Sequence, residues 1–241
     1  MLTEEQVTEF IEGTLVLVDW REQLKQSKFN FLHKLENRFK QITHYENISW
    51  GAKPFEELKP PTVEEVIYQC VEEGGGACLQ LNYFLKLILE VLGYDVFAVG
   101  GQTQTVNDPK SHIINIVRFP KTEPGVTSSP DDKTYFVLYM VDVGFARPAP
   151  GIVNLNELPH SYKCGGFTIQ LRNNPELERY ERILIGGNPI KGKFESPDET
   201  YLDAHFTITP RKFEEFDQTM TWIFNDPAYS FFLNTTFRED Q

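Results

Sequence analysis

Cys78 stands where a thiol could serve as a nucleophile. It follows three consecutive glycines, residues 74–76, which allow a sharp bend, and it opens a run of apolar residues spaced three or four positions apart. This spacing predicts a helix, and the unpaired amides at a helix start favour an anion, so a cysteine there can have a low pKa. The same position also suits a small thiol buried in the core, and position alone leaves both interpretations open.

His112 and Asp142 could orient and deprotonate that thiol. His112 opens one apolar, β-branched run and Asp142 lies near the end of the next, so the two runs predict an antiparallel hairpin. If Phe119 faces Tyr135 in this hairpin, His112 lies directly opposite Asp142, with Cβ atoms about 4.5–5.5 Å apart. The carboxylate could then hold one imidazole nitrogen and raise the basicity of the other. The alternative is a surface histidine and an unrelated aspartate. A slip of one residue in the strand register would put the two side chains on opposite faces of the hairpin.

Helices are predicted in the first part of the chain. Thr3 and Thr62 each open a capping box, and Asn30 caps a helix that runs to about Gln41. The central helix, over residues 74–92, carries a broad apolar stripe, which is typical of a core helix.

Strands dominate the second part of the chain. They are predicted at residues 112–119, 135–143, 167–171, 183–185 and 204–209. Pro210 then opens a predicted helix over residues 211–224. Between residues 151 and 190 the pattern shows short strands and turns, and no motif there indicates chemistry.

The composition describes a globular protein with a strong negative charge. The chain has 241 residues, 40% of them hydrophobic, and 23 basic against 35 acidic residues give a net charge of −12. This charge argues against nonspecific binding to nucleic acid or to an anionic membrane. No apolar run approaches the roughly 20 residues that span a bilayer, and the N-terminal composition fits no signal peptide, so we expect a cytoplasmic protein.

The cysteines point to neither a disulfide framework nor a zinc site. Cys70, Cys78 and Cys164 are odd in number and lack paired spacing. Cys70 lies on the apolar stripe of the helix that follows Thr62, which predicts a core residue. We therefore expect reduced thiols and no bound metal.

Three short segments carry the candidate residues in the order cysteine, histidine, aspartate. They are residues 75–82 (GGACLQLN), 111–114 (SHII) and 141–145 (VDVGF). Together they resemble the arylamine N-acetyltransferase family, whose pattern is a GGxC helix start, a histidine on a strand and a VDxGF strand end. Residues 45–47 (YEN) resemble the family's aromatic-Glu-Asn element.

The resemblance implies an α+β fold with a papain-like Cys-His-Asp arrangement. A helical bundle over residues 1–93 would carry the nucleophile, and an antiparallel β-barrel over residues 94–203 would carry the histidine and the aspartate. Residues 204–241 would form a shortened, partial α/β third domain.

The resemblance also implies a role for each site residue. Cys78 would attack the thioester of acetyl-coenzyme A, with His112 as general base and Asp142 as its orienting partner. Acetyl-coenzyme A would be a co-substrate, with no tightly bound cofactor and no metal. The acceptor would be a small aromatic amine or hydrazine, as in xenobiotic metabolism. Phe145 and Tyr45 would border its pocket, and Ser230 would contact coenzyme A.

Some departures from the family pattern keep a second function open. Gly74, preceded by Glu72 and Glu73, occupies the position before GGxC where the family usually has arginine. The chain also stops at Gln241, where many relatives continue. The alternative is therefore a catalytically impaired member of the family that acts as a binding or interaction protein. A cysteine protease or transglutaminase with the same chemistry is a third possibility.

Overall fold

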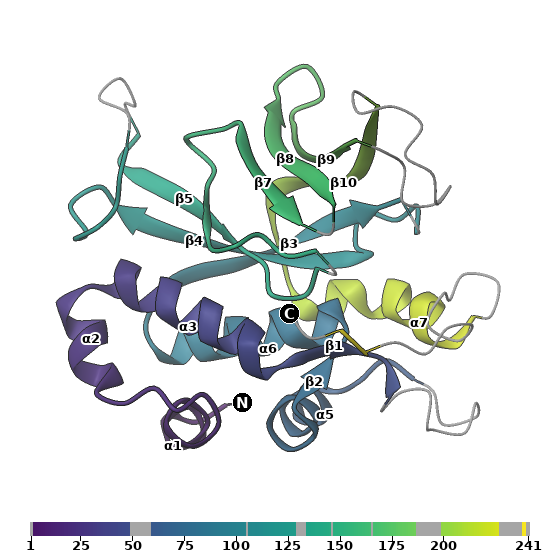
Figure 1. Ribbon diagram of the computed structural model, residues 1–241. Helices are drawn as coiled ribbons and strands as arrows, with labels where there is room; N and C mark the ends of the chain where they lie inside the picture. The colour runs from purple at the N-terminus through teal and green to yellow at the C-terminus, as the bar shows by residue number, and fades with distance from the viewer. Residues whose placement is uncertain are drawn as a thin grey trace.

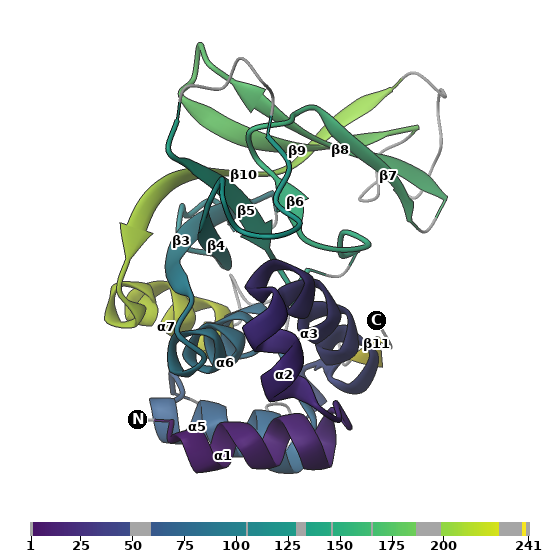
Figure 2. The ribbon, with the colours of Figure 1, turned by 90° about the vertical axis from the view of Figure 1, so that its left-hand side faces the viewer.

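A layer of helices lies beneath a large curved sheet (Figure 1). The computed structural model describes residues 2–48, 59–104, 106–128, 134–145, 147–164, 166–186, 199–226 and 238–239. Seen from the side, the helices gather at one end of the molecule and the outer strands β7, β8 and β9 at the other (Figure 2). This arrangement confirms the predicted α+β fold, with a helical bundle packed on an antiparallel barrel.

Two helices begin where capping signals in the sequence predict them. Thr3 and Thr62 form the predicted capping boxes with Gln6 and Glu65. The described helices are α1 (Glu4–Glu9) with the π-helical turn η1 (Phe10–Thr14), α2 (Trp20–Gln26), α3 (Lys28–Ile42), α5 (Val63–Tyr68) with the π-helical turn η3 (Gln69–Glu73), α6 (Cys78–Val91), the 3-10 turn η4 (Phe213–Phe216) and α7 (Asp217–Asn225). Within the described part of the chain, no helix has the length and apolar character needed to cross a membrane.

The predicted cap of α3 is wrong by three residues. Ser27 is the N-cap, and its hydroxyl accepts a hydrogen bond from the amide of Asn30 at 3.1 Å. The carboxylate of Glu123, far along the chain, accepts from the amide of Lys28 at 2.7 Å. A carboxylate satisfies the open amides of a helix start well, but one this distant leaves no local signal in the sequence.

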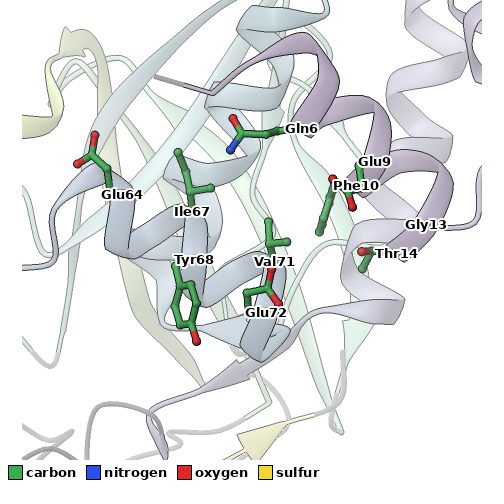
Figure 3. Close-up of a pocket in the computed structure, with 10 residues that line it drawn as sticks. All are labelled: Gln6, Glu9, Phe10, Gly13, Thr14, Glu64, Ile67, Tyr68, Val71 and Glu72. Carbon is green, nitrogen blue, oxygen red and sulfur yellow. The ribbon is translucent and has the colours of Figure 1, made fainter.

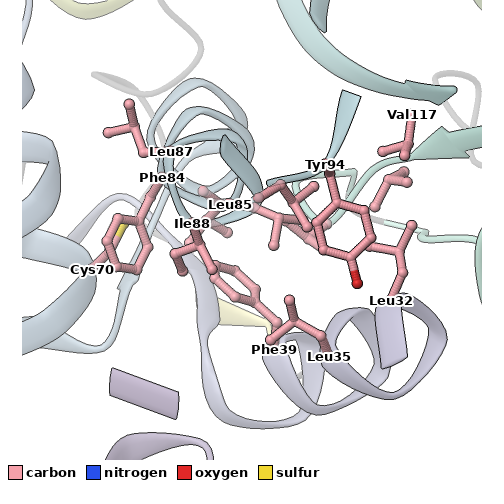
Figure 4. Packing of buried hydrophobic residues seen from close by; sticks show 14 of the residues in the cluster. Leu32, Leu35, Phe39, Cys70, Phe84, Leu85, Leu87, Ile88, Tyr94 and Val117 are labelled. Atoms are coloured by element: carbon pink, nitrogen blue, oxygen red, sulfur yellow. The ribbon is translucent and has the colours of Figure 1, made fainter. Parts of the chain in front are cut away.

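The helix α6 lies at the centre of the core (Figure 4). Its side chains Phe84, Leu85 and Ile88 are fully buried and belong to one cluster with Phe39 of α3. The rings of Phe84 and Phe10 meet edge to face, with centroids 5.0 Å apart. Burying each such side chain contributes about 1.5–3 kcal/mol, so the first turn of α6 is held by a rigid base.

Two sheets are present among the described residues, and the larger forms the barrel. The small sheet has the order β11 (Arg238–Glu239), β1 (His44–Glu46), β2 (Gly75–Gly76). The large sheet has the order β6 (Val153–Asn154), β5 (Phe136–Val141), β4 (His112–Pro120), β3 (Asp95–Thr103), β10 (Thr200–Arg211), β9 (Arg179–Ile185), β8 (Phe167–Asn174), β7 (His160–Cys164). Each of its neighbouring strands pairs antiparallel.

The register of the predicted hairpin differs by two residues. Phe119 of β4 lies opposite Val137 of β5, where we expected Tyr135. An even shift leaves every side chain on its original face, so His112 and Asp142 still share a face. The predicted placement of this pair on one face is confirmed, although the predicted partners along the strands are wrong.

The predicted start of the last helix is also wrong. Pro210 belongs to β10, where it pairs with Val99 after a shift in register that follows Phe206. Proline has no amide to donate, which excludes it from most regular strand positions. At such an irregularity the ladder of hydrogen bonds is interrupted, so proline is tolerated. The expected boundary between residues 203 and 204 falls inside β10, which pairs with β3 and β9 on both sides of it. The division into three domains stays a prediction.

Candidate active site

Cys78 is the first residue of α6. The strand β2 leads into it, and β2 pairs in parallel with β1, which places Tyr45 beside Gly76. Ala77 is the N-cap and offers no side-chain hydrogen bond, so the amides of the first turn remain open to an anion at the thiol. Cys78 is only 7% exposed.

His112 and Asp142 form a buried hydrogen-bonded pair beside this thiol. The imidazole Nε2 of His112 lies 2.7 Å from Oδ2 of Asp142. Because Asp142 engages Nε2, the other ring nitrogen, Nδ1, is left for the thiol. Burial lowers the pKa of His112, but the charges of Asp142 and Cys78 and the hydrogen bonds to both outweigh it and raise that pKa to about 10.

The carboxyl of Asp142 stays ionised in this buried place. Burial raises its pKa, but the charge of His112 and the hydrogen bonds that it accepts have the larger effect, so the pKa is lowered. The lowered pKa of Asp142 and the raised pKa of His112 both favour the charged form of the group. The geometry can therefore support a thiolate–imidazolium pair.

Asn82 holds the aspartate in position, a role that was not predicted from the sequence. Its Nδ2 donates to Oδ1 of Asp142 and to the carbonyl of Ile113, each at 2.8 Å. Its Oδ1 accepts from the amide of Val143 at 2.9 Å. Asn82 lies four residues after the cysteine of the GGxC motif, about one helical turn, so this spacing places both residues on the same face of α6.

Gly144 allows the segment after Asp142 to approach α6 closely. A Cβ atom at this position would lie 2.6 Å from Cα of Cys78 and 2.7 Å from Nδ2 of Asn82. Its amide donates to Oδ1 of Asp142 at 3.0 Å. The glycine of the VDxGF motif is therefore required by contact with the backbone of the nucleophile.

The structure describes two of the other three predicted site residues. The ring of Phe145 packs edge to face against His112, with centroids 4.7 Å apart and planes at 72°. Tyr45 is buried next to β2, by its backbone pairing with Gly76. Ser230 lies outside the described residues.

Neither of the other thiols lies in a comparable place. Cys70 is fully buried, as predicted, and this burial, with the charges of Glu46 and Glu73, raises its pKa. Cys164 is half-buried on β7, at the edge of the barrel. The described residues hold no group of three side chains that could bind a metal ion.

A hydrogen-bond network of one glutamate and two glutamines lies near Gly74, where the family pattern has arginine. Gly74 has a φ of +71°, which disfavours any other residue, and its carbonyl accepts from the amide of His44. Glu46 accepts from Nε2 of Gln69 at 3.3 Å. Gln69 in turn accepts from Gln80 at 3.4 Å. Amides thus connect the helix that precedes the nucleophile with β1.

A separate pocket of about 560 Å³ lies among the helices (Figure 3). It opens between α1 with η1 and α5 with η3, and none of Cys78, His112 and Asp142 lines it. Its lining includes three apolar side chains and three carboxylates: Phe10, Ile67, Val71, Glu9, Glu64 and Glu72. These carboxylates would repel the phosphates of a nucleotide, so this pocket does not suit an anionic acyl donor.

Comparisons with known proteins agree with this geometry. A family model described as N-acetyltransferase matches residues 28–239. The arylamine N-acetyltransferase C of Bacillus anthracis superposes with a TM-score of 0.69 at 18% identity, covering 98% of this chain and 82% of that chain. The enzyme of Mycobacterium abscessus gives 0.68 at 15%, covering 98% and 74%.

A third solved structure has a glutamate as the third member of its triad. The Bacillus cereus arylamine N-acetyltransferase with a Cys-His-Glu triad superposes with a TM-score of 0.61 at 17% identity, covering 92% of this chain and 82% of that chain. In the present chain an aspartate pairs with the histidine. Curated protein sequences give no match. Since the family model spans most of the chain, the protein belongs to the arylamine N-acetyltransferase family of acyltransferases.

Proposed function

We propose that the protein transfers an acetyl group from acetyl-coenzyme A to arylamines or arylhydrazines through an acetyl-cysteine intermediate. The observation that supports this function best is the buried His112–Asp142 pair beside Cys78, at 2.7 Å between Nε2 and Oδ2. We place the reaction in the cytoplasm, where free thiols stay reduced.

The first half-reaction needs only a free thiolate. The thiolate of Cys78 attacks the thioester carbonyl of acetyl-coenzyme A, a new C–S bond forms, and the C–S bond to coenzyme A breaks. The protonated His112 gives its proton to the leaving sulfur, so coenzyme A leaves as a thiol and the imidazole becomes neutral. One thioester replaces another, so this step is nearly balanced in free energy.

The second half-reaction needs a base. The acceptor nitrogen attacks the carbonyl of acetyl-Cys78, its proton passes to the now neutral His112, and Cys78 leaves as a thiolate. Asp142 keeps the imidazole in the tautomer that accepts this proton at Nδ1 and stabilises the charged ring that forms. The two substrates thus react in turn, in a ping-pong cycle.

The aromatic residues are proposed to contact the acceptor. Phe145 lies against His112, so an acceptor that reaches the imidazole would pass along this ring. Tyr45 is proposed as a second wall because β1 carries it next to the segment that leads to Cys78. We propose that Ser230 contacts coenzyme A, by the resemblance alone.

Mass spectrometry of the acid-quenched protein tests this function. Wild type mixed with acetyl-coenzyme A, without an acceptor, should gain one acetyl group, and Cys78→Ala should gain none. Cys164→Ala is the matched control, because this half-buried thiol lies on β7 and should leave acetylation intact. An acetyl group on folded Cys78→Ala would refute the assignment of Cys78 as the nucleophile. No adduct on wild type with any acyl-coenzyme A would favour a binding or interaction protein.

A further inference from the structure

The segment that follows Asp142 is held from the barrel side by a buried arginine. Arg182 lies on β9 and is 6% exposed. Its Nη2 donates to the carbonyl of Arg147 and, at 3.5 Å, to the hydroxyl of Tyr162. Its Cζ lies 3.9 Å from the ring centroid of Phe145. A single guanidinium therefore contacts both the backbone of this segment and its aromatic side chain.

Asp203 keeps that guanidinium in place. The pairing of β10 with β9 shifts at Asp203, which is the extra residue of a β-bulge. A bulge re-aims the side chain that it carries, and here the carboxylate accepts from Nη1 of Arg182. It also lies 3.4 Å from Nη2 of Arg147. Neither residue could be identified from the sequence, because no motif marks them and 21 positions separate them.

Phe145 connects this ion pair to the active site. Its ring contacts the guanidinium of Arg182 and also the imidazole of His112, at 4.7 Å between ring centroids. A line of direct contacts therefore runs from Asp203 through Arg182 and Phe145 to His112. A cation over an aromatic ring favours one geometry of the pair, so the contact restricts where the ring can lie.

The cost of burying these charges indicates that they position the segment after Asp142 more than they stabilise the fold. Removing two ions from water costs several kcal/mol per ion, and an apolar pair of similar volume is often as stable. The far end of the same segment is held in the same way, by Lys40 of α3. Its Nζ donates to the carbonyl of Ala149 at 2.6 Å and pairs with Glu36 at 2.6 Å. Two buried cations on separate elements thus each bind a carbonyl of one segment.

We propose that Arg182 is a positioning residue for acyl transfer, which keeps Phe145 against His112 so that an aromatic acceptor meets the acetyl-cysteine in a reactive geometry. This inference rests on the proposed function and deepens it. Arg182 acts through Phe145 and touches neither substrate. Its loss should therefore slow the step that uses an aromatic acceptor more than the step that forms the acetyl-enzyme.

The decisive variant is Arg182→Lys. Lysine keeps the charge beside Asp203, but it lacks the planar fork that contacts a carboxylate, a carbonyl and a ring at once. Arg172→Lys is the matched control, because Arg172 pairs with Glu181 on the neighbouring strand and is half-exposed. Should Arg182→Lys fail to fold, Arg182→Met combined with Asp203→Asn removes both charges of the Arg182–Asp203 pair together.

The assay follows each half-reaction separately, with an aniline and with hydrazine as acceptors. We expect Arg182→Lys to slow transfer to the aniline about 10- to 100-fold, the cost of a small misplacement at the reacting atoms. Transfer to hydrazine, which has no ring to place, and acetylation by acetyl-coenzyme A should slow only a few-fold. In a Phe145→Leu background the same substitution should have little further effect, because the two residues act as one unit.

The outcomes separate this inference from the function on which it rests. Equal losses for aniline and hydrazine, or full additivity with Phe145→Leu, would overturn the positioning role while leaving the transferase in place. A wild-type protein that never takes up an acetyl group would overturn the proposed function, and the positioning role with it. Unchanged kinetics of Arg182→Lys and of the double variant would also exclude the role.

Discussion

Asp142→Asn should remove two properties of His112 at once. Asn82 and Gly144 both donate to Oδ1 of Asp142, so the carbonyl oxygen of an asparagine would stay there. Its amide nitrogen would then face Nε2 of His112 and donate to it, which places the imidazole proton on Nδ1. A ring with that proton cannot accept one from the thiol or from the acceptor amine.

The magnitude follows from the pKa of His112. It is raised from 6.5 to about 10, which corresponds to about 5 kcal/mol in favour of the charged ring. Without the charge of Asp142, only Cys78 opposes the lowering effect of burial, so the pKa of His112 should fall. With the wrong tautomer added, we expect acetyl transfer to slow by about 10⁴-fold, as when other buried triad aspartates are replaced.

An NMR titration measures the change directly. The chain has only five histidines, so the ring signals of His112 can be assigned against His112→Gln. Wild type should keep a charged ring at pH 8, and Asp142→Asn should lose that charge. Asp95→Asn is the control, because Asp95 pairs with Arg118 at the exposed start of β3. A titration midpoint for His112 that Asp142→Asn leaves unchanged would refute the reasoning.

Three further substitutions test the support of the site. Gly144→Ala places a Cβ 2.6 Å from Cα of Cys78, so transfer should fall about 100-fold, whereas Gly13→Ala, with nothing within 4 Å, should not affect it. Asn82→Ala leaves buried partners unsatisfied and should lower the free energy of unfolding in urea by about 1–3 kcal/mol; no change would contradict the proposed support of Asp142. Burial raises the pKa of Glu36 from 4.5 to about 6, so its contribution to stability is present below pH 4.5 and is lost as the pH rises through 6, by about 2 kcal/mol. Urea titrations at pH 4.5 and 7 should show this loss in wild type, and an identical loss in Glu36→Gln would exclude Glu36 as its source.

Local chemistry explains which features could be predicted from the sequence. The capping boxes at Thr3 and Thr62 involve residues three positions apart, and apolar spacing identifies α6 without knowledge of its neighbours. The candidate triad was accessible for the same reason, since short motifs surround each of its members. The even shift of the hairpin register preserved the shared face of His112 and Asp142.

Distant contacts explain what could not be predicted. Glu123 reaches the start of α3 from 95 positions along the chain, and this contact accompanies an N-cap three residues before the expected one. Arg182 and Asp203 meet only because a bulge turns a side chain between two strands. Pro210 predicts a helix start from the sequence, but it lies within β10, next to a shift in register at which a strand tolerates proline.

The most direct test of the central claim is a chase of the isolated acetyl-enzyme. Wild type acetylated by acetyl-coenzyme A is freed of the donor and then mixed with an aromatic amine, and both protein and amine are weighed by mass spectrometry. The account predicts that the acetyl group leaves Cys78 and appears on the amine in equal amount. An acetyl-enzyme that stays acetylated with every aromatic amine and hydrazine, or one that only hydrolyses, would contradict it.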